Sequence, residues 1–477
     1  MAPDDRPRPR LAEHQQPFAR SGRGHAGLRR KAPGQLRRHA PRLIVPTAAP
    51  LRIWIATGGS HGDVHPFLGI GRELRRRGHD VTLSVHPHFR DDVQAAGLRH
   101  FSLGEHIDFE AVLRNPDVMD ARRGPRTVLK LVLDSIPSTV ARLGEAWRDS
   151  PPDVVLAHHI CIGVRWLCEA RGLPLALATL SPLLWYSTSD PVPPAQRRPG
   201  RFHAALARLY FGAAWPVARR VLNVVVNRAR RRSGFPPQSD VFIRDIQGGD
   251  ITLGLWSPRF RSPTPGDPCN GRICGFPWYD RSDRTPALPG DVERFLASGP
   301  PPIVFALGTA AVHVPGDFFD LAVQACARLR QRGILLVGRD GAARPQLPSG
   351  VMAIGYLPFS LILPRAAAVV HHGGIGSTGQ SLRAGCPTVV VPHAHDQFHN
   401  ALHVRRLGAG TLAARRGLTV ASLASALDEV VARADVRQRA AALAEEIAKE
   451  SGLETAADCV EQLASEGSRS RPARPRS

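Results

Sequence analysis

Residues 371–400 of the 477-residue chain read HHGGIGSTGQSLRAGCPTVVVPHAHDQFHN, and this stretch decides the fold. Apolar residues at Ala366–Val370 and Thr388–Val391 predict two short, buried strands of a parallel sheet. Between them, Ser377 can cap a helix that stops at Gly385, a residue suited to a helix C-terminus. The stretch therefore predicts a strand, a glycine-rich turn, a helix and a second strand.

The glycine-rich turn is a predicted anion site. Backbone N–H groups approach an anion closely where side chains are absent, and those at a helix N-terminus lack intrahelical partners. The residues of this site are His372, Gly373, Gly374, Gly376 and Ser377. Asp396 and Gln397 follow the second strand, at the edge where open α/β sheets hold ligands.

Two alternatives compete with a ligand site of this kind. Glycine turns between a strand and a helix also occur in α/β folds without any ligand. A nucleotide triphosphatase is the second alternative, because residues 374–381 nearly fit the pattern G-x-x-x-x-G-K-[ST]. Gln380 occupies the position of the required lysine, which argues against that class of enzyme.

The block resembles the donor-binding signature of nucleotide-sugar-dependent glycosyltransferases with the GT-B fold. The residues that carry the resemblance are His372-Gly373-Gly374-x-Gly376-Ser377, Leu382-x-x-Gly385-x-Pro387, Pro392 and Asp396-Gln397-x-x-Asn400-Ala401. The most similar branch contains bacterial rhamnosyltransferases, sterol glucosyltransferases and antibiotic glycosyltransferases, and the likeness covers residues 51–455. It implies an α/β protein with two Rossmann-like domains whose parallel sheets face each other across a cleft.

The resemblance assigns the donor diphosphate and sugar to the second half of the chain. It places the diphosphate against His372 and the backbone of Gly374–Ser377, joined by the hydroxyl of Thr309. It places the hydroxyls of the sugar against Asp396 and Gln397. The co-substrate is a UDP- or dTDP-sugar, and no metal is expected, since no Asp-x-Asp that would hold a metal-bound diphosphate is present.

The resemblance also assigns the base and the ribose of the donor. Leu357 to Phe359 match the segment that packs on the base. The family often has an aromatic residue there, and its displacement to Phe359 leaves the stacking residue open. Gln380 falls where many members have a ribose-binding Glu, and its amide can still bond a ribose hydroxyl with less charge assistance.

The first half offers GGSHGDVHP at residues 58–66, which resembles the family's G-x-x-G-D-x-x-P turn. Asp63 aligns with the catalytic base, and burial in an apolar cleft would raise its pKa toward a useful range. Capping of a helix that begins at Pro66 is the alternative role for Asp63. His61 and His65 flank it, and either could be the base instead.

The remaining pattern divides the chain into two α/β halves. Strands are predicted at Leu51–Thr57, Asp80–Val85, Val154–Ala157, Leu175–Ala178, Ile251–Leu255, Ile303–Leu307 and Ile334–Val337, and helices at Pro66–Arg77 and Phe318–Arg330. The predicted segments are a disordered basic tail at 1–50, an N-terminal acceptor-binding domain at 51–280, a linker with one short helix at 281–302, a C-terminal nucleotide-sugar-binding domain at 303–455, and a helix end with a basic tail at 456–477.

Residues 201–232 carry eight arginines among aromatic and aliphatic residues. They predict a basic, amphipathic pair of helices split near Pro216. Two interpretations stay open: the pair lies on an anionic membrane, or it lines an apolar cleft and presents arginine to water. The second interpretation, with the segment Leu183–Tyr186, favours an apolar acceptor.

The net charge of +22 raises the hypothesis of a nucleic-acid-binding protein. Much of that charge lies in the tails, since residues 1–50 hold eleven Lys or Arg against three Asp or Glu. No helix-turn-helix, zinc or RNA-binding motif appears, so no nucleic-acid partner is expected. The seven scattered cysteines suit reduced thiols in a cytoplasmic protein, peripheral at the inner face of the membrane if residues 201–232 bind lipid. A monomer or a homodimer is expected.

The sequence thus predicts an inverting glycosyltransferase. It would move a hexose or deoxyhexose to a hydroxyl of a small apolar acceptor, such as a lipid, a sterol or a natural-product aglycone. The alternative is an epimerase-like GT-B protein without acceptor transfer. Such enzymes need acid and base carboxylates inside the donor cleft, and the acceptor-side turn around Asp63 argues against them.

Overall fold

The computed structural model describes residues 49–105, 107–187, 190, 201–279, 287–338 and 347–469, without the side chains of 201–211 and 468–469. These residues belong to one compact unit, Ala48–Ser477. The predicted basic tail at 1–50, apart from residues 49–50, and the end of the predicted tail at 456–477, from residue 470, lie outside the described residues.

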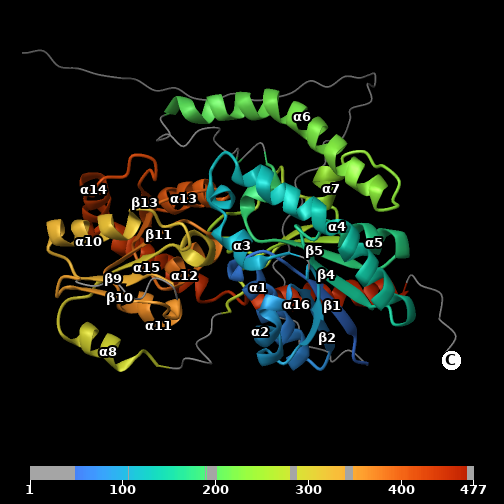
Figure 1. The fold of residues 1–477 in the computed structure, drawn as a ribbon, viewed down its shortest axis with the longest axis horizontal. Helices are drawn as coiled ribbons and strands as arrows, with labels where there is room; N and C mark the ends of the chain where they lie inside the picture. Colours follow the sequence, from blue (N-terminus) through green and yellow to red (C-terminus); the bar gives the residue numbers. More distant parts are fainter. Residues whose placement is uncertain are drawn as a thin grey trace, which may run out of the picture. The chain divides into compact units, whose positions relative to one another are not determined.

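Strands of the first half form a seven-stranded parallel sheet with the order β3-β2-β1-β4-β5-β6-β7 (Figure 1). Its strands are β1 (Arg52–Ala56), β2 (Asp80–Val85), β3 (Arg99–Ser102), β4 (Val154–His158), β5 (Leu175–Thr179), β6 (Ile251–Gly254) and β7 (Gly271–Ile273). Helices separate the strands up to β6, and a loop without a helix joins β6 to β7; the connections cross over the sheet and leave neighbouring strands parallel.

Strands of the second half form a six-stranded parallel sheet with the order β10-β9-β8-β11-β12-β13. Its strands are β8 (Ile303–Ala306), β9 (Gly333–Leu336), β10 (Val351–Ile354), β11 (Ala368–His371), β12 (Thr388–Val390) and β13 (Gly410–Leu412). The strand order reverses between β1 and β4 in the first sheet and between β8 and β11 in the second. Open α/β sheets commonly bind ligands at such switch points. The predicted fold class, two Rossmann-like halves with parallel sheets, is confirmed.

Helices cover both sheets. Those of the first half are α1 (His61–Arg76), α2 (Arg90–Ala95), α3 (Phe109–Arg114), α4 (Gly124–Asp149), α5 (Ile162–Arg171), α6 (Arg201–Arg232) and α7 (Val241–Gln247), with 3₁₀ turns η1 (Pro87–Phe89), η2 (Pro116–Met119) and η3 (Pro182–Trp185). Later come α8 (Gly290–Ala297), α9 (Gly308–Ala311), α10 (Phe318–Leu329), α11 (Phe359–Ile362), η6 (Leu363–Arg365), α12 (Ile375–Arg383), α13 (Gln397–Arg406), α14 (Val420–Val431), α15 (Ala434–Ile447) and α16 (Gly452–Arg469).

The first helices of the two site motifs begin earlier than the sequence predicts. Helix α1 starts at His61 rather than Pro66, because Ser60 and Asp63 form a capping box one turn before the proline. Helix α12 starts at Ile375, so Gly374 is its N-cap and Ser377 is already inside the first turn. The prediction that Ser377 caps this helix is therefore wrong, whereas the predicted stop at Gly385 holds, with φ of +63°.

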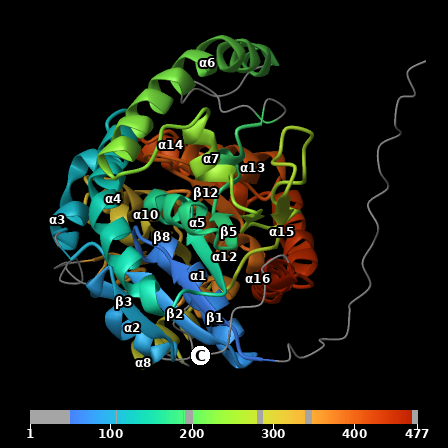
Figure 2. The same cartoon turned by 90° about the vertical axis from the view of Figure 1, so that its right-hand side faces the viewer.

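Helix α6 is one continuous helix rather than the predicted pair (Figure 1 and Figure 2). Pro216 lies inside it without splitting it. Pro216 lacks the N–H that would donate to the carbonyl oxygen of Gly212. Because Gly212 is exposed, water can donate to that oxygen instead. No helix in the described part of the chain is long and apolar enough to span a bilayer.

Helix α16 returns from the second half to pack on the first sheet, where Figure 1 shows it beside α1. Ala456, Ala457, Val460 and Ala464 are buried there in one core with residues of β1, β2 and β4. Helix α8 instead packs on the second half through Val292 and Leu296, together with Leu288 just before it. The end of the chain thus stabilises the half that its beginning forms.

Placing a carboxylate at the centre of this contact should destabilise the protein. Val460 is fully buried, so Val460→Asp leaves a charge without a partner in an apolar core. We expect a loss of at least about 3 kcal/mol, measured by denaturant unfolding. Gln462→Asp on the exposed face of the same helix is the matched control and should change stability by a few tenths of a kcal/mol. Equal stability of the two variants would contradict the packing of α16.

Candidate active site

A single large cleft lies where the carboxyl ends of the two sheets meet. It has a volume of about 1760 Å³ and is lined by residues that follow β1 and β4 in the first half and β8 and β11 in the second. These strands flank the switch point of each sheet. All the predicted site residues except Gly373 line this cleft.

Asp63 lies in the first turn of α1, at the wall formed by the first half. Its Oδ2 accepts hydrogen bonds from the backbone N–H of Ser60 at 2.8 Å and from the Ser60 hydroxyl at 3.0 Å. These bonds hold the carboxylate in one orientation at the helix N-terminus, where negative charge is favoured. The capping role weighed for Asp63 is thus present, although for a helix that begins at His61.

Burial raises the pKa of Asp63 to about 6. The bonds from Ser60 oppose that rise, and the neighbouring charge of Asp396 adds to it, while His395 lowers the pKa. Asp63 and Asp396 come from opposite halves, so the cleft brings these two carboxylates within electrostatic reach of each other. A carboxylate with a pKa near 6 can both carry charge and accept a proton at neutral pH.

His61 and His65 lie beside Asp63 on the same helix. The ring centroids of the two histidines are 5.6 Å apart, and His65 also packs edge-to-face on Tyr279 at 5.3 Å. Nε2 of His61 lies 3.9 Å from Oδ2 of Asp92. Both histidines line the cleft, so geometry leaves each within the same site as Asp63.

The glycine-rich turn of the second half exposes the N-terminus of α12 to the cleft. Gly374 is the N-cap and makes no side-chain bond, so no side chain covers the first N–H groups of the helix. Gly374, Ile375, Gly376 and Ser377 line the cleft directly. Partner-free N–H groups and the helix dipole favour an anion at this position.

His372 is packed between two glycines. A Cβ on Gly308 would lie 2.3 Å from Cε1 of His372, and a Cβ on Gly374 would lie 2.5 Å from its Nε2. Burial lowers the pKa of His372 well below its ordinary value, and the neighbouring His371 and His393 lower it further. Its buried Nδ1 has no hydrogen-bond partner among the described residues. The ring is therefore neutral and packed at the glycine-rich turn.

Gly373 does not line the cleft, but its backbone conformation shapes the turn. Its φ is +91°, and a Cβ there would lie 2.6 Å from Cγ1 of Val390. Its carbonyl accepts a bond from Nδ2 of Asn400 at 2.9 Å, and its N–H donates to Nδ1 of His371. Only glycine fits this conformation without strain, so the turn depends on it.

Asp396 and Gln397 begin α13 at the same rim. Asp396 is the N-cap, and its Oδ2 accepts from Nδ2 of Asn400 at 2.8 Å. The Oε1 of Gln397 accepts from the backbone N–H groups of His393 and Ala394, at 2.8 and 3.0 Å. Gln397 is thereby held in place by the loop before it, with its amide nitrogen directed toward Met119 of the first half.

An aromatic residue that the sequence did not single out, Tyr356, directly precedes the segment predicted to meet the donor base. Leu357 and Phe359 line the cleft but also pack in the core of the second half. Tyr356 lines the same cleft with 51% of its surface exposed. Thr309 on α9 and Gln380 on α12 complete this wall. Tyr356 is half-exposed, whereas Leu357 and Phe359 pack in the core. The sequence alone does not display this difference in burial.

The first half contributes a wall that the sequence analysis also missed. Helix α4 lines the cleft with a mainly apolar face, whose members are Pro125, Val128, Leu131, Val132, Ser135, Ile136 and Thr139. Leu183 and Leu184 of the predicted aromatic segment line it too, while Trp185 and Tyr186 do not. No side chain of residues 212–232 lines the cleft, so the interpretation of this segment as a cleft wall is wrong for that part of α6, and the side chains of 201–211 lie outside the described ones.

His395 connects the two halves across the cleft. It is one of three described residues other than glycine with positive φ, at 55°, and such strain persists where surrounding contacts hold it. Its Nε2 lies 2.8 Å from the carbonyl oxygen of Val118 in η2, close enough for a hydrogen bond. This contact places the η2 segment over the rim that carries Asp396.

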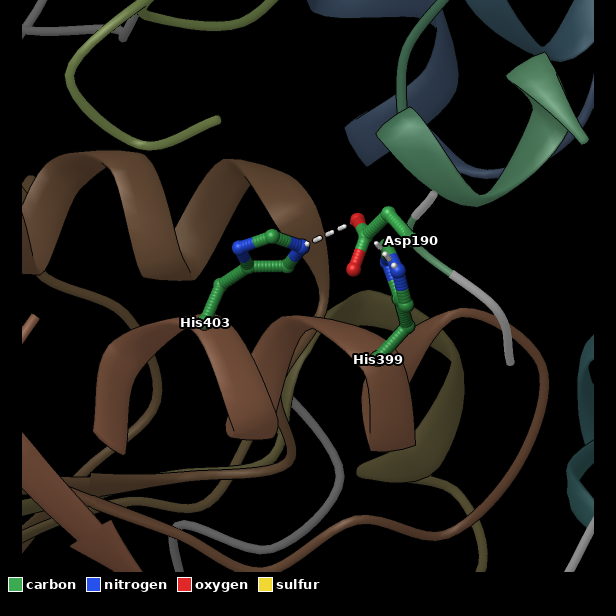
Figure 3. A group of neighbouring side chains, drawn as sticks. All are labelled: Asp190, His399 and His403. Carbon is green, nitrogen blue, oxygen red and sulfur yellow. Dashed lines mark hydrogen bonds and ion pairs between the residues drawn. The ribbon is translucent and has the colours of Figure 1, made fainter. Parts of the chain in front are cut away.

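A second connection between the halves centres on Asp190 (Figure 3). Its Oδ2 lies 3.1 Å from Nε2 of His399 and 2.9 Å from Nε2 of His403, both on α13, and its Oδ1 lies 2.8 Å from Arg406. Burial would raise the pKa of Asp190, but the bonds from the two histidines lower it well below the ordinary range. The two histidines have metal-ligand spacing, but Arg406 and Arg261 also contact this carboxylate. Since these cations already neutralise the carboxylate, we interpret the group as an ion-pair cluster that fixes α13.

Comparisons with known proteins agree with this geometry. Residues 333–462 match the family described as "Erythromycin biosynthesis protein CIII-like, C-terminal domain", and residues 53–184 match the "Glycosyltransferase family 28 N-terminal domain". The chain is 32% identical to the O-mycaminosyltylonolide 6-deoxyallosyltransferase of Streptomyces fradiae over 374 residues, which span 75% of this chain and 84% of that protein. It is 27% identical to a sterol 3-beta-glucosyltransferase of Arabidopsis thaliana over 75% of this chain and 57% of that longer protein.

Solved structures share the fold at lower sequence identity. The calicheamicin glycosyltransferase CalG4 superposes with a TM-score of 0.65 at 23% identity, over 89% of this chain and all of that one. The glycosyltransferase VinC, solved in complex with dTDP, superposes with a TM-score of 0.62 at 19% identity, over 87% of this chain and all of that one.

Adding a methyl group at Gly308 should disturb the anion-binding turn. Gly308 has φ of +71°, so Gly308→Ala strains the backbone by about 1–2 kcal/mol and displaces the ring of His372. We expect weaker binding of UDP or dTDP, measured by calorimetry. Gly350→Ala is the matched control, because its Cβ would meet nothing within 4 Å. Unchanged nucleotide affinity in Gly308→Ala would show that the turn does not contact the diphosphate.

Proposed function

The chain belongs to the GT-B glycosyltransferases that include antibiotic and sterol glycosyltransferases, and we propose that it is an inverting enzyme acting on a UDP- or dTDP-linked hexose or deoxyhexose. One observation carries the proposal. Asp63 and the N-terminus of α12 lie on opposite walls of one cleft. A proton acceptor and a diphosphate site are therefore available to one substrate pair, as glycosyl transfer from a nucleotide sugar requires.

The proposed reaction is a single displacement at the anomeric carbon. The acceptor hydroxyl attacks that carbon while its proton passes to the carboxylate of Asp63. The bond between the anomeric carbon and the phosphate oxygen breaks, and the nucleoside diphosphate leaves with both electrons. The N–H groups of α12 and the ring of His372 stabilise the charge that develops on the diphosphate. No metal is needed in this scheme.

We propose that the donor lies along the second half. Asp396 and Gln397 hold hydroxyls of the sugar, Thr309 joins the diphosphate site, and Gln380 bonds the ribose. Tyr356, the half-exposed aromatic side chain of this wall, stacks on the base in addition to Leu357 and Phe359. The complex of VinC with dTDP supports a thymidine nucleotide at this wall.

We propose an apolar acceptor, such as a lipid, a sterol or a natural-product aglycone. The apolar face of α4 and the side chains of Leu183 and Leu184 support this class, because they cover the acceptor side of the cleft. The names of the relatives include an O-mycaminosyltylonolide 6-deoxyallosyltransferase and a sterol 3-beta-glucosyltransferase, which is consistent with it. The seven cysteines are all free, with four of them buried, which supports a reaction in the cytoplasm.

Replacing Asp63 by asparagine should remove the base and keep the fold. The amide oxygen can still accept from Ser60, so Asp63→Asn retains the capping interaction. We expect kcat/KM for transfer to a hydroxylated acceptor to fall by roughly 10²- to 10⁴-fold. His61→Gln and His65→Gln are the comparison variants, and a larger loss in either would assign the base to that histidine. Sugar conversion by the wild-type protein without acceptor would instead support the epimerase-like alternative.

The pH dependence of transfer should follow the titration of Asp63. Its carboxyl must be ionised to accept a proton, and its pKa is raised to about 6, so kcat/KM should fall tenfold per pH unit below about pH 6 and level off above it. An undisplaced acid limb near pH 4 would contradict the buried base. The limb near pH 6 should disappear from the residual activity of Asp63→Asn.

A further inference from the structure

The outer face of α6 carries three exposed valines in a row. Val217, Val221 and Val224 are 63%, 58% and 60% exposed, and they are the large exposed aliphatic residues of the described chain. Spacings of four and three residues place them on one side of the helix. Apolar side chains gathered in this way on a solvated helix mark a contact surface more often than scattered ones do.

Arginines flank this stripe and lack acidic partners. Arg220, Arg228, Arg231 and Arg232 are exposed and form no ion pair with any residue that the structure describes. Helix α6 contains no Asp or Glu along its whole length. The outer face is therefore apolar along its centre and positively charged around it.

The opposite face of α6 is fixed to the first half. Val226 is fully buried in a cluster with Ile136 and Trp166, and Trp215 stacks on Tyr186 at 4.5 Å between ring centroids. Arg230 and Arg219 bridge to Glu169 and Asp240 of the body. Since these contacts set the rotation of the helix, the exposed valine stripe faces away from the first half.

We propose that this face of α6 docks on an anionic phospholipid membrane. The three valines enter the boundary between headgroups and acyl chains, and the flanking arginines extend to the lipid phosphates. One surface thereby satisfies both the apolar stripe and the unpaired positive charge. The helix lies in the plane of the interface and does not cross it.

Charge argues against the other occupants. A second copy of α6 would bring arginines against arginines, and the basic segment 1–50 would be repelled in the same way. A nucleic acid would pair with the arginines but leave the valines in water. Helix α6 also contacts α4, which lines the cleft, so docking would bring a membrane-dissolved acceptor near the proposed site. The docking does not depend on that proposed function.

Vesicle binding by the full-length protein tests the proposal without any substrate. We expect co-sedimentation with phosphatidylglycerol-containing vesicles and at least tenfold weaker binding to phosphatidylcholine vesicles. Val221→Ser/Val224→Ser should weaken the binding at least tenfold, mainly at high salt. Arg220→Gln/Arg228→Gln should weaken it mainly at low salt, because screening already removes that attraction at high salt.

Arg328→Gln on α10 is the matched control, since Arg328 is also exposed and has no described ion partner. It should bind vesicles like the wild type, and all variants should unfold at the wild-type temperature. Absence of binding to anionic vesicles overturns the proposal. Binding that both α6 variants retain also overturns it, because another basic surface is then responsible. Binding to DNA that needs the arginines but not the valines would assign the face to nucleic acid instead.

Discussion

The cleft holds two buried carboxyl groups within electrostatic reach of each other. Asp63 and Asp396 reach it from opposite halves, and burial raises the pKa of both carboxyl groups. The N-terminus of α1, through Ser60, and the side chain of Asn400 partly offset that cost. A nucleotide sugar would add a diphosphate to the same space. The exposed N-terminus of α12 would offset the repulsion between that diphosphate and the carboxylates, because its backbone N–H groups supply positive potential without a mobile counter-ion.

Glycine is required at the anion-binding turn for reasons of space as well as of conformation. The ring of His372 fills the volume that side chains on Gly308 and Gly374 would occupy, and Val390 fills the volume beside Gly373. Burial keeps the ring neutral, so it carries one N–H rather than a full positive charge.

Contacts between the halves explain how a cleft of this size keeps its geometry. The ion-pair cluster of Asp190 ties α13 to the first half. The contact between His395 and Val118 connects the halves just before the first residue of α13. Helix α16 adds an apolar connection, because it leaves the second half and buries four side chains in the core of the first. Together they fix Asp396 and Gln397 relative to the helix that carries Asp63.

The sequence by itself determined nine of the thirteen described strands, the turn and the motif residues, and it missed the four edge strands β3, β7, β10 and β13. Runs such as Val369–Val370 are apolar for sheet burial, and the glycines and Asp396-Gln397 are local patterns that a chain displays directly. The structure decided where α1 begins, because the capping box of Ser60 and Asp63 starts the helix at His61 and leaves Pro66 inside it. It also decided that α16 belongs to the first half, that α4 rather than α6 lines the cleft, and that Tyr356 is the exposed aromatic residue. These outcomes depend on contacts between residues far apart in the chain, and local periodicity carries no information about which distant surface will cover a given face.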